Sequence, residues 1–128
     1  MDKKKVFLLD DNPDFVSVTK IRLESNNYEV ITATDGKEAL EKIKDAKPDV
    51  ILLDILMPEM DGYQVCECLK EEQKTADIPI ILLTGKDLEP RGIEDRCSKL
   101  GIDAFLRKPV HAKELLAKID EVLKINQK

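Results

Sequence analysis

Short apolar runs recur along the chain at regular spacing, separated by more polar segments. The runs cover residues 6–9, 30–33, 50–53, 78–83 and 104–106. Between the runs lie stretches of about 10 to 16 residues in which apolar positions recur at helical spacing, a pattern typical of repeated strand–helix–strand units. Because such crossovers are right-handed and cover both faces of a sheet, we predict an α/β fold with five strands in a doubly wound parallel sheet and five helices.

The first predicted helix has recognisable signals at both ends. Asn12 is a suitable N-cap, and Pro13 suits the first helical position, where its missing N–H costs nothing. Asn26–Asn27 should end the helix, since Asn tolerates the left-handed conformation. The apolar positions of this helix cover a wide arc that is less clean than in the other helices: Phe15, Val16, Val18, Ile21 and Leu23.

The other helices are bounded by similar signals. Asp35 with Glu38 forms a capping-box-like pair at the start of the second helix. The third should start near Asp61–Gly62 and the last near His111, where the amphipathic pattern is strongest. The fourth should begin only around Pro90, and we expect the segment around it, residues 86–92, to be mobile because it contains both a proline and a glycine.

Composition narrows the classes of protein. The 128 residues suffice for one domain, so we expect residues 1–128 to form a single domain with no output domain visible. A net charge of -5 argues against a surface built to bind nucleic acid or anionic membrane. The three cysteines show no metal-ligand spacing, and the apolar run near the N-terminus is too short for a signal peptide or membrane span. We therefore place the protein in the cytoplasm.

Polar residues follow four of the predicted strands. Asp10–Asp11, Asp54, Thr84 and Lys108–Pro109 come at or just after the carboxyl ends of the first, third, fourth and fifth strands. In open α/β sheets these ends meet at one crevice, where ligands bind. Three carboxylates there would repel one another, since two unit charges about 4 Å apart cost roughly 4 kcal/mol at an effective dielectric near 20. The cluster should therefore raise the pKa values of its own carboxyl groups or recruit cations.

The residues in this crevice suit phosphoryl transfer. Three carboxylates and Lys108 sum to a charge of -3 + 1 = -2, which a divalent ion would neutralise. Oxygen ligands without histidine favour magnesium. A carboxylate beside a hard cation, a lysine and a hydroxyl matches the needs of phosphoryl transfer to oxygen, and indicates an aspartyl phosphate on Asp54.

The same residues resemble a known family. Asp10–Asp11, Asp54, the loop Met57–Gly62, Thr84–Gly85 and Lys108–Pro109 are similar to the motifs of the receiver domain of two-component response regulators, over essentially the whole chain. The resemblance implies a flavodoxin-like fold with strand order 2-1-3-4-5, as in the chemotaxis receiver. It also implies a phosphorelay function in signal transduction.

The resemblance assigns the chemistry of the crevice. Asp54 would accept a phosphoryl group from a phosphohistidine on a sensor histidine kinase or phosphotransfer protein. Asp11, Asp54 and the backbone carbonyl of Leu56 would hold Mg²⁺ or Mn²⁺, with Asp10 acting through a water. The chain would catalyse only its own phosphorylation and dephosphorylation, so it would not be an enzyme in the usual sense.

The resemblance also implies a switch. Lys108 would pair with the phosphoryl group, Thr84 would turn its hydroxyl toward it, and Phe105 would be the aromatic rotamer switch. Pro109 would follow a cis peptide bond. The face formed by the fourth helix, fifth strand and fifth helix would then meet a downstream effector or a linked output domain, with the chain a monomer or a phosphorylation-dependent dimer and with no direct nucleic-acid or membrane contact.

Two alternatives stay open at this point. One is a phosphatase or phosphotransferase that forms an aspartyl phosphate on small phosphate esters, although Leu56 stands where a second acid would serve as general acid. The other is a receiver-like binding module that is never phosphorylated. Leu56 carries a further expectation: an apolar side chain cannot orient water, so we predict slow self-dephosphorylation.

Overall fold

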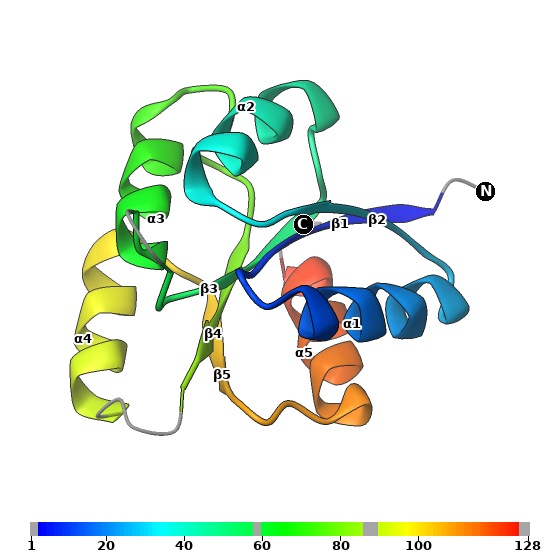
Figure 1. Ribbon diagram of the computed structural model, residues 1–128. Helices are drawn as coiled ribbons and strands as arrows, with labels where there is room; N and C mark the ends of the chain where they lie inside the picture. Colours follow the sequence, from blue (N-terminus) through cyan, green and yellow to red (C-terminus); the bar gives the residue numbers. More distant parts are fainter. Residues whose placement is uncertain (1–2, 58–59, 86–89, 126–128) are drawn as a thin grey trace.

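The computed structural model describes residues 3–57, 60–85 and 90–125, in which five strands alternate with five helices (Figure 1). The strands are β1 (Lys4–Leu9), β2 (Tyr28–Ala33), β3 (Val50–Asp54), β4 (Ile80–Thr84) and β5 (Ala104–Arg107). The helices are α1 (Pro13–Ser25), α2 (Gly36–Ala46), α3 (Gly62–Glu71), α4 (Pro90–Leu100) and α5 (Ala112–Ile125). Of the segment expected to be mobile, residues 86–89 lie outside the described residues, as do residues 58–59 of the motif loop.

The five strands form one parallel sheet in the order β2-β1-β3-β4-β5, which confirms the predicted fold class and strand order. The register pairs Leu9 with Leu53, Asp54 with Leu83, and Thr84 with Arg107. The carboxyl ends of β1, β3, β4 and β5 therefore come level with one another. The strand order reverses between β1 and β3, the position where open α/β sheets form a ligand crevice.

The sheet separates two hydrophobic cores (Figure 1). Helices α2, α3 and α4 cover one face, while α1 and α5 cover the other. Alternate residues of each central strand serve the two cores: in β1, Phe7 and Leu9 join the first, and Val6 and Leu8 join the second. This explains why the central strands read as continuous apolar runs instead of alternating ones.

The helix α1 begins and ends as predicted. The Asn12 side chain accepts hydrogen bonds from the backbone N–H groups of Asp14 and Phe15 at 3.0 and 3.2 Å. Asn27 adopts a positive φ of 71° beyond the helix end. Of the apolar residues of this helix, Val16 and Leu23 are buried against the sheet, whereas Val18 and Ile21 are exposed.

The caps of α2 and α3 differ from expectation in detail. Asp35 accepts a hydrogen bond from the Glu38 N–H, but the Glu38 carboxylate accepts one from the N–H of Thr34, one residue before the cap. The predicted reciprocal box at α2 is therefore incomplete. A full capping box occurs at α3 between Asp61 and Gln64, where each side chain accepts from the other's backbone N–H at 2.9 Å.

One strand starts later than predicted. The apolar run 78–83 predicted a strand from residue 78, but β4 begins at Ile80 and ends at Thr84. The N–H of Ile78 donates to the carbonyl of Thr75 in a turn, and Pro79 has no N–H to donate to a sheet. None of the helices in the described part of the chain has the length and apolar run needed to span a bilayer.

Candidate functional site

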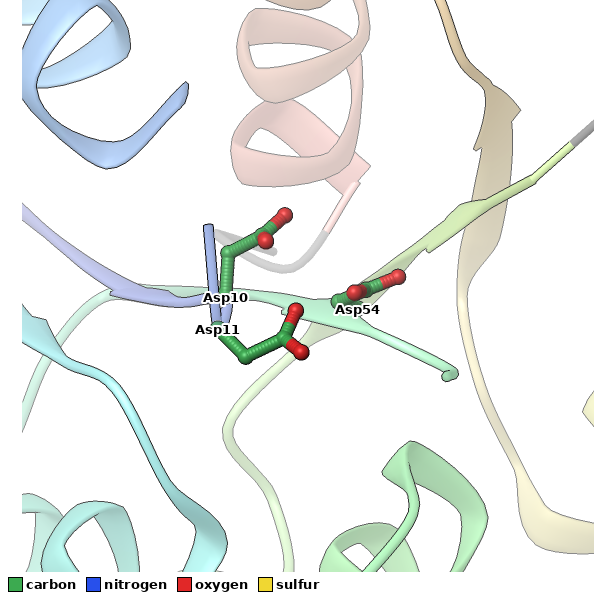
Figure 2. Close-up of side chains that lie close together, drawn as sticks. All are labelled: Asp10, Asp11 and Asp54. Atoms are coloured by element: carbon green, nitrogen blue, oxygen red, sulfur yellow. The ribbon is translucent and has the colours of Figure 1, made fainter. Parts of the chain in front are cut away.

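The site is built where β1 and β3 end. Asp10 and Asp11 directly follow β1, and Asp54 is the last residue of β3. Figure 2 shows the three side chains gathered at this edge of the sheet. One carboxylate oxygen from each lies within 4.8 Å of the others. Asp10 and Asp54 are buried and Asp11 is exposed, so the cluster has one side open to solvent.

Asp10 is held on both of its carboxylate oxygens. Its Oδ1 accepts a hydrogen bond of 3.0 Å from the backbone N–H of Asn12, within the turn that leads into α1. Its Oδ2 accepts one of 2.6 Å from the ammonium of Lys108. Asp10 has no exposed surface, and a buried carboxylate is tolerated when it is paired and hydrogen-bonded in this way.

Lys108 reaches the cluster from the loop that follows β5. Its Nζ lies 3.7 Å from Asp54 Oδ2, so in this structure the ammonium pairs more closely with Asp10 than with Asp54. The backbone N–H of Lys108 donates to the carbonyl of Thr84 at 2.7 Å, which fixes this loop to the end of β4. The Lys108–Pro109 peptide bond is cis, as predicted.

The carboxyl of Asp54 is the acid with a strongly perturbed pKa. The pKa of Asp54 is raised to about 6, chiefly by burial and then by the neighbouring Asp10 and Asp11, against the lowering effects of Lys108 and of a hydrogen bond from the Leu56 backbone N–H. The one ammonium therefore leaves the negative charge of the cluster incompletely compensated. Such a site favours an additional cation.

Close packing fixes the end of β3 against α3. A Cβ atom at Gly62 would lie 2.4 Å from the carbonyl oxygen of Asp54 and 2.9 Å from the Cα of Ile55. The N–H of Gly62 donates to the carbonyl of Ile55 at 2.8 Å. Only glycine allows this approach, which explains the glycine that closes the motif loop.

Thr84 and Phe105 lie on neighbouring strands. Thr84 ends β4 and has no exposed surface, and its Oγ1 has no hydrogen-bond partner among the described residues. An unpaired buried hydroxyl is unusual. Phe105, in β5, is half-buried and packs against the core beneath α2, α3 and α4. Leu56 is 57% exposed beside the crevice.

Comparison with known proteins identifies the family of this chain. A family model described as the response regulator receiver domain matches residues 6–120. The chain belongs to the response regulator receiver domain family. The receiver is thus confirmed as a signalling domain of two-component systems, as its motifs predicted.

Sequence relatives and solved structures agree with this assignment. The receiver is 38% identical over 124 residues to the alkaline phosphatase synthesis transcriptional regulatory protein PhoP of Bacillus subtilis, covering 94% of this chain and 49% of PhoP. It is similar to the CheY-like receiver domain protein of Methanospirillum hungatei, with a TM-score of 0.89, 29% identity and 98% of each chain covered. It is also similar to chemotaxis protein CheY4 of Vibrio cholerae, with a TM-score of 0.87, 30% identity, and 94% of this chain and 98% of that one covered.

The curated relatives are regulators and not classical enzymes, and the chain spans about half of the length of those it matches. The structure brings together the predicted residues Asp10, Asp11, Asp54 and Lys108. Two neighbours of the site were not singled out in the sequence for this role. Asn12 was expected only to cap α1, and Phe15 only to be one of the apolar residues of that helix.

Proposed function

We propose that Asp54 is the phosphoryl acceptor of this receiver. The observation that carries the proposal is the meeting of the three carboxylates within 4.8 Å, with the Lys108 ammonium 3.7 Å from Asp54 Oδ2. Phosphoryl transfer requires a nucleophile beside positive charge that stabilises the equatorial oxygens. Asp54 lies beside both the carboxylates that follow β1 and the lysine that follows β5.

The proposed donor is a phosphohistidine on a sensor histidine kinase or phosphotransfer protein. A carboxylate oxygen of Asp54 attacks the phosphorus, a P–O bond forms and the P–N bond breaks. The electron pair of that bond returns to the imidazole nitrogen, which takes up a proton from water. The product is an acyl phosphate on Asp54, and the Lys108 ammonium pairs with one of its oxygens.

The residues present fit a divalent cation such as Mg²⁺ or Mn²⁺. The donors are carboxylate oxygens on a partly open cluster, and such hard ligands suit these ions. We assign Asp11, Asp54 and the Leu56 backbone carbonyl to the ion, and Asp10 to an indirect contact through water. When bound, the ion neutralises charge on the carboxylates and on the transferred phosphoryl oxygens.

We further propose that phosphorylation is read through Thr84 and Phe105. The unpaired Thr84 hydroxyl is a donor that a phosphoryl oxygen on Asp54 can satisfy. Phe105 lines a groove between α4, β5 and α5, together with Cys97 and Lys118. A change in the position of Thr84 that admits a new Phe105 rotamer would shift the population of this face toward a form that binds an effector or a linked output domain.

Acetyl phosphate and Mg²⁺ provide the direct test. We expect the intact mass of the wild type to rise by one phosphoryl group, and expect no gain in Asp54→Ala. Asp45→Ala is the matched control, because Asp45 is an exposed acid on α2, away from the cluster. Phosphorylation of Asp54→Ala at the wild-type rate would overturn the assignment. Continuous turnover of a chromogenic phosphate ester would favour the phosphatase alternative instead.

A further inference from the structure

The ammonium of Lys108 has an aromatic neighbour in addition to its two carboxylates. Lys108 Nζ lies 4.5 Å from the centre of the Phe15 ring, over its face. The same atom is 2.6 Å from Asp10 and 3.7 Å from Asp54, and the lysine side chain is 25% exposed. The face of an aromatic ring attracts a cation, and the attraction grows as water is excluded. Phe15 therefore occupies one side of the ammonium that water would otherwise fill.

The backbone around Phe15 is fixed by residues of the site itself. Asn12 Oδ1 accepts the Phe15 N–H at 3.2 Å, and the Asn12 N–H donates to Asp10 Oδ1 at 3.0 Å. Asp10 Oδ2 in turn accepts from Lys108. These contacts form a closed circuit that links the first turn of α1 to the loop after β5, through Asp10, Asn12, Phe15 and Lys108.

This circuit of contacts matters because the ammonium of a lysine is easily displaced from one position. Its ammonium is a compact charge on a flexible four-carbon stem, with three donors and many rotamers. The bond to Asp10 alone would let the ammonium pivot around that carboxylate. The Phe15 face closes the side toward α1, while the side toward Asp54 stays available to the ammonium.

We propose that Phe15 is a positioning residue: its ring face holds the Lys108 ammonium beside Asp54, where it meets the oxygens of the incoming phosphoryl group. The inference rests on the proposed acceptor role of Asp54. Phe15 touches neither the donor nor the reacting atoms in this account. It acts through Lys108, so its effect must disappear when Lys108 is removed.

Three variants test the contact with Mg²⁺ and acetyl phosphate as donor. Phe15→Leu keeps an apolar side chain of similar reach but loses the ring, and we expect it to slow phosphorylation of Asp54 about threefold to tenfold, the effect expected from loss of a partly exposed cation–π contact. Phe15→Trp restores a ring face and should stay close to the wild-type rate. Val18→Ala is the control on α1, since Val18 is 47% exposed and lies one turn further along the helix.

A double-mutant cycle separates positioning from packing. In a Lys108→Ala background we expect Phe15→Leu to cause no further slowing, because the cation is already gone. An equal slowing in both backgrounds, or a wild-type rate for Phe15→Leu in the presence of Lys108, would overturn the positioning role. If the wild type itself gains no phosphoryl group on Asp54, the acceptor assignment fails, which is a different result.

An NMR measurement tests the same contact independently of reaction rates, and its first readout needs only the wild type. Protons that lie over the face of an aromatic ring are shifted upfield in NMR spectra by the ring current. We expect the Lys108 ε-methylene protons to be upfield of those of exposed Lys124, and expect this difference to be lost in Phe15→Leu. Equal shifts for Lys108 and Lys124 in the wild type would show that the ring does not cover the ammonium, and would overturn the proposal.

Discussion

Lys108 Nζ donates a hydrogen bond of 2.6 Å to Asp10 Oδ2, across a sequence separation of 98 residues. Lys108 Nζ lies farther from Asp54, at 3.7 Å, so in this structure the closest partner of the ammonium is the residue that follows β1 and not the last residue of β3. If Asp54 is the acceptor, as we propose, its phosphoryl group would compete with Asp10 for the same ammonium. The resting pair limits how negative the cluster becomes before any phosphoryl group or cation is bound.

Removal of this ammonium should weaken folding and strengthen cation binding. Lys108→Ala leaves Asp10 buried without its partner, which we expect to lower the free energy of unfolding by about 2 to 3 kcal/mol, below the range for fully buried pairs because Lys108 is partly exposed. The local charge becomes more negative, so Mg²⁺ affinity should rise. Urea denaturation and Mg²⁺ titration test both effects. Lys118→Ala, which removes an exposed ion pair with Glu121, should change neither by much.

The charge of Asp54 should destabilise the metal-free receiver at neutral pH. Its pKa is about 6 in the folded state, above the ordinary value of 3.8 for an aspartic acid, so the folded state binds the proton more tightly than the unfolded state. The stability gained from that proton is complete below about pH 4 and is lost as the pH rises through about 6. In the presence of a chelator at pH 7.5, the free energy of unfolding of Asp54→Asn should exceed that of the wild type by about 2 to 3 kcal/mol.

That difference should vanish near pH 4, where the wild-type carboxyl is protonated. Denaturation curves at several pH values provide the measurement. Equal stability of wild type and Asp54→Asn at pH 7.5, or a deficit in the variant, would show that the carboxylate is not destabilised in this site. Added Mg²⁺ should stabilise the wild type more than Asp54→Asn, since the variant lacks one anionic ligand.

Substitution of the buried Thr84 should not lower the free energy of unfolding, unlike most substitutions in a protein core. Thr84→Val removes a buried polar group that has no hydrogen-bond partner in the described part of the chain, so we expect an unchanged or higher stability, by about 1 kcal/mol. Thr75→Val is the matched control, because Thr75 is equally buried but donates to the Leu69 carbonyl at 2.6 Å. It should lose about 1 to 2 kcal/mol. Opposite signs in thermal or urea unfolding would support the distinction.

The same substitution should impair the switch. If Thr84 donates to the phosphoryl group, beryllofluoride with Mg²⁺ should shift the NMR signals of Phe105 in the wild type and shift them less in Thr84→Val. An equal response in both proteins would contradict the proposed role of the Thr84 hydroxyl.

The lifetime of the acyl phosphate should depend on Leu56. This side chain is 57% exposed beside the crevice and offers no hydrogen bond to an attacking water. Leu56→Asn supplies one, and a single hydrogen bond of about 1 kcal/mol in the transition state corresponds to roughly fivefold faster loss of the phosphoryl group. The decay of the phosphorylated mass after removal of acetyl phosphate measures it. An unchanged or longer lifetime would refute the prediction of slow self-dephosphorylation from this residue.

The three cysteines should differ sharply in reactivity. Burial raises the pKa of Cys66 to about 12, and Cys97 is also buried with a raised pKa, whereas Cys68 is half-buried. Because the thiolate is the nucleophile, a raised pKa slows alkylation at any pH below it. At pH 8 iodoacetamide should modify Cys68 first, with Cys66 reacting only as fast as the protein opens. Peptide mapping with and without urea tests the order, and early labelling of Cys66 would contradict it.

The sequence predicted that the site residues lie at one edge of the sheet, but it did not predict which of them form ion pairs with one another. Apolar runs at regular spacing fixed a parallel sheet, and a parallel sheet brings residues at the ends of β1, β3, β4 and β5 to one edge, so Asp10, Asp54, Thr84 and Lys108 were correctly expected there. Which carboxylate the ammonium contacts depends on side-chain rotamers across the crevice. Sequence periodicity carries no information on that choice, and the contact with the Phe15 ring was missed for the same reason.

Some local features were also ambiguous in the sequence for physical reasons. The apolar arc of α1 did not reveal that Val18 and Ile21 are exposed, because five apolar positions on a short helix fit more than one buried face. The start of β4 was misplaced because Ile78 is apolar but precedes Pro79, and its N–H is used in a turn. The roles of Asp54 as acceptor and of Phe105 as switch stay predictions.

The sheet acts as a partition between two independently packed compartments. Among the described residues, no buried side chain belongs to both hydrophobic clusters. Helix α4 packs against one cluster and α5 against the other. Substitutions behind α4 and behind α5 are therefore separated by a layer of backbone, and their energetic effects should add. If the proposed face of α4, β5 and α5 binds a partner, its two halves can diversify one at a time, while the acidic edge between β1 and β3 keeps its geometry.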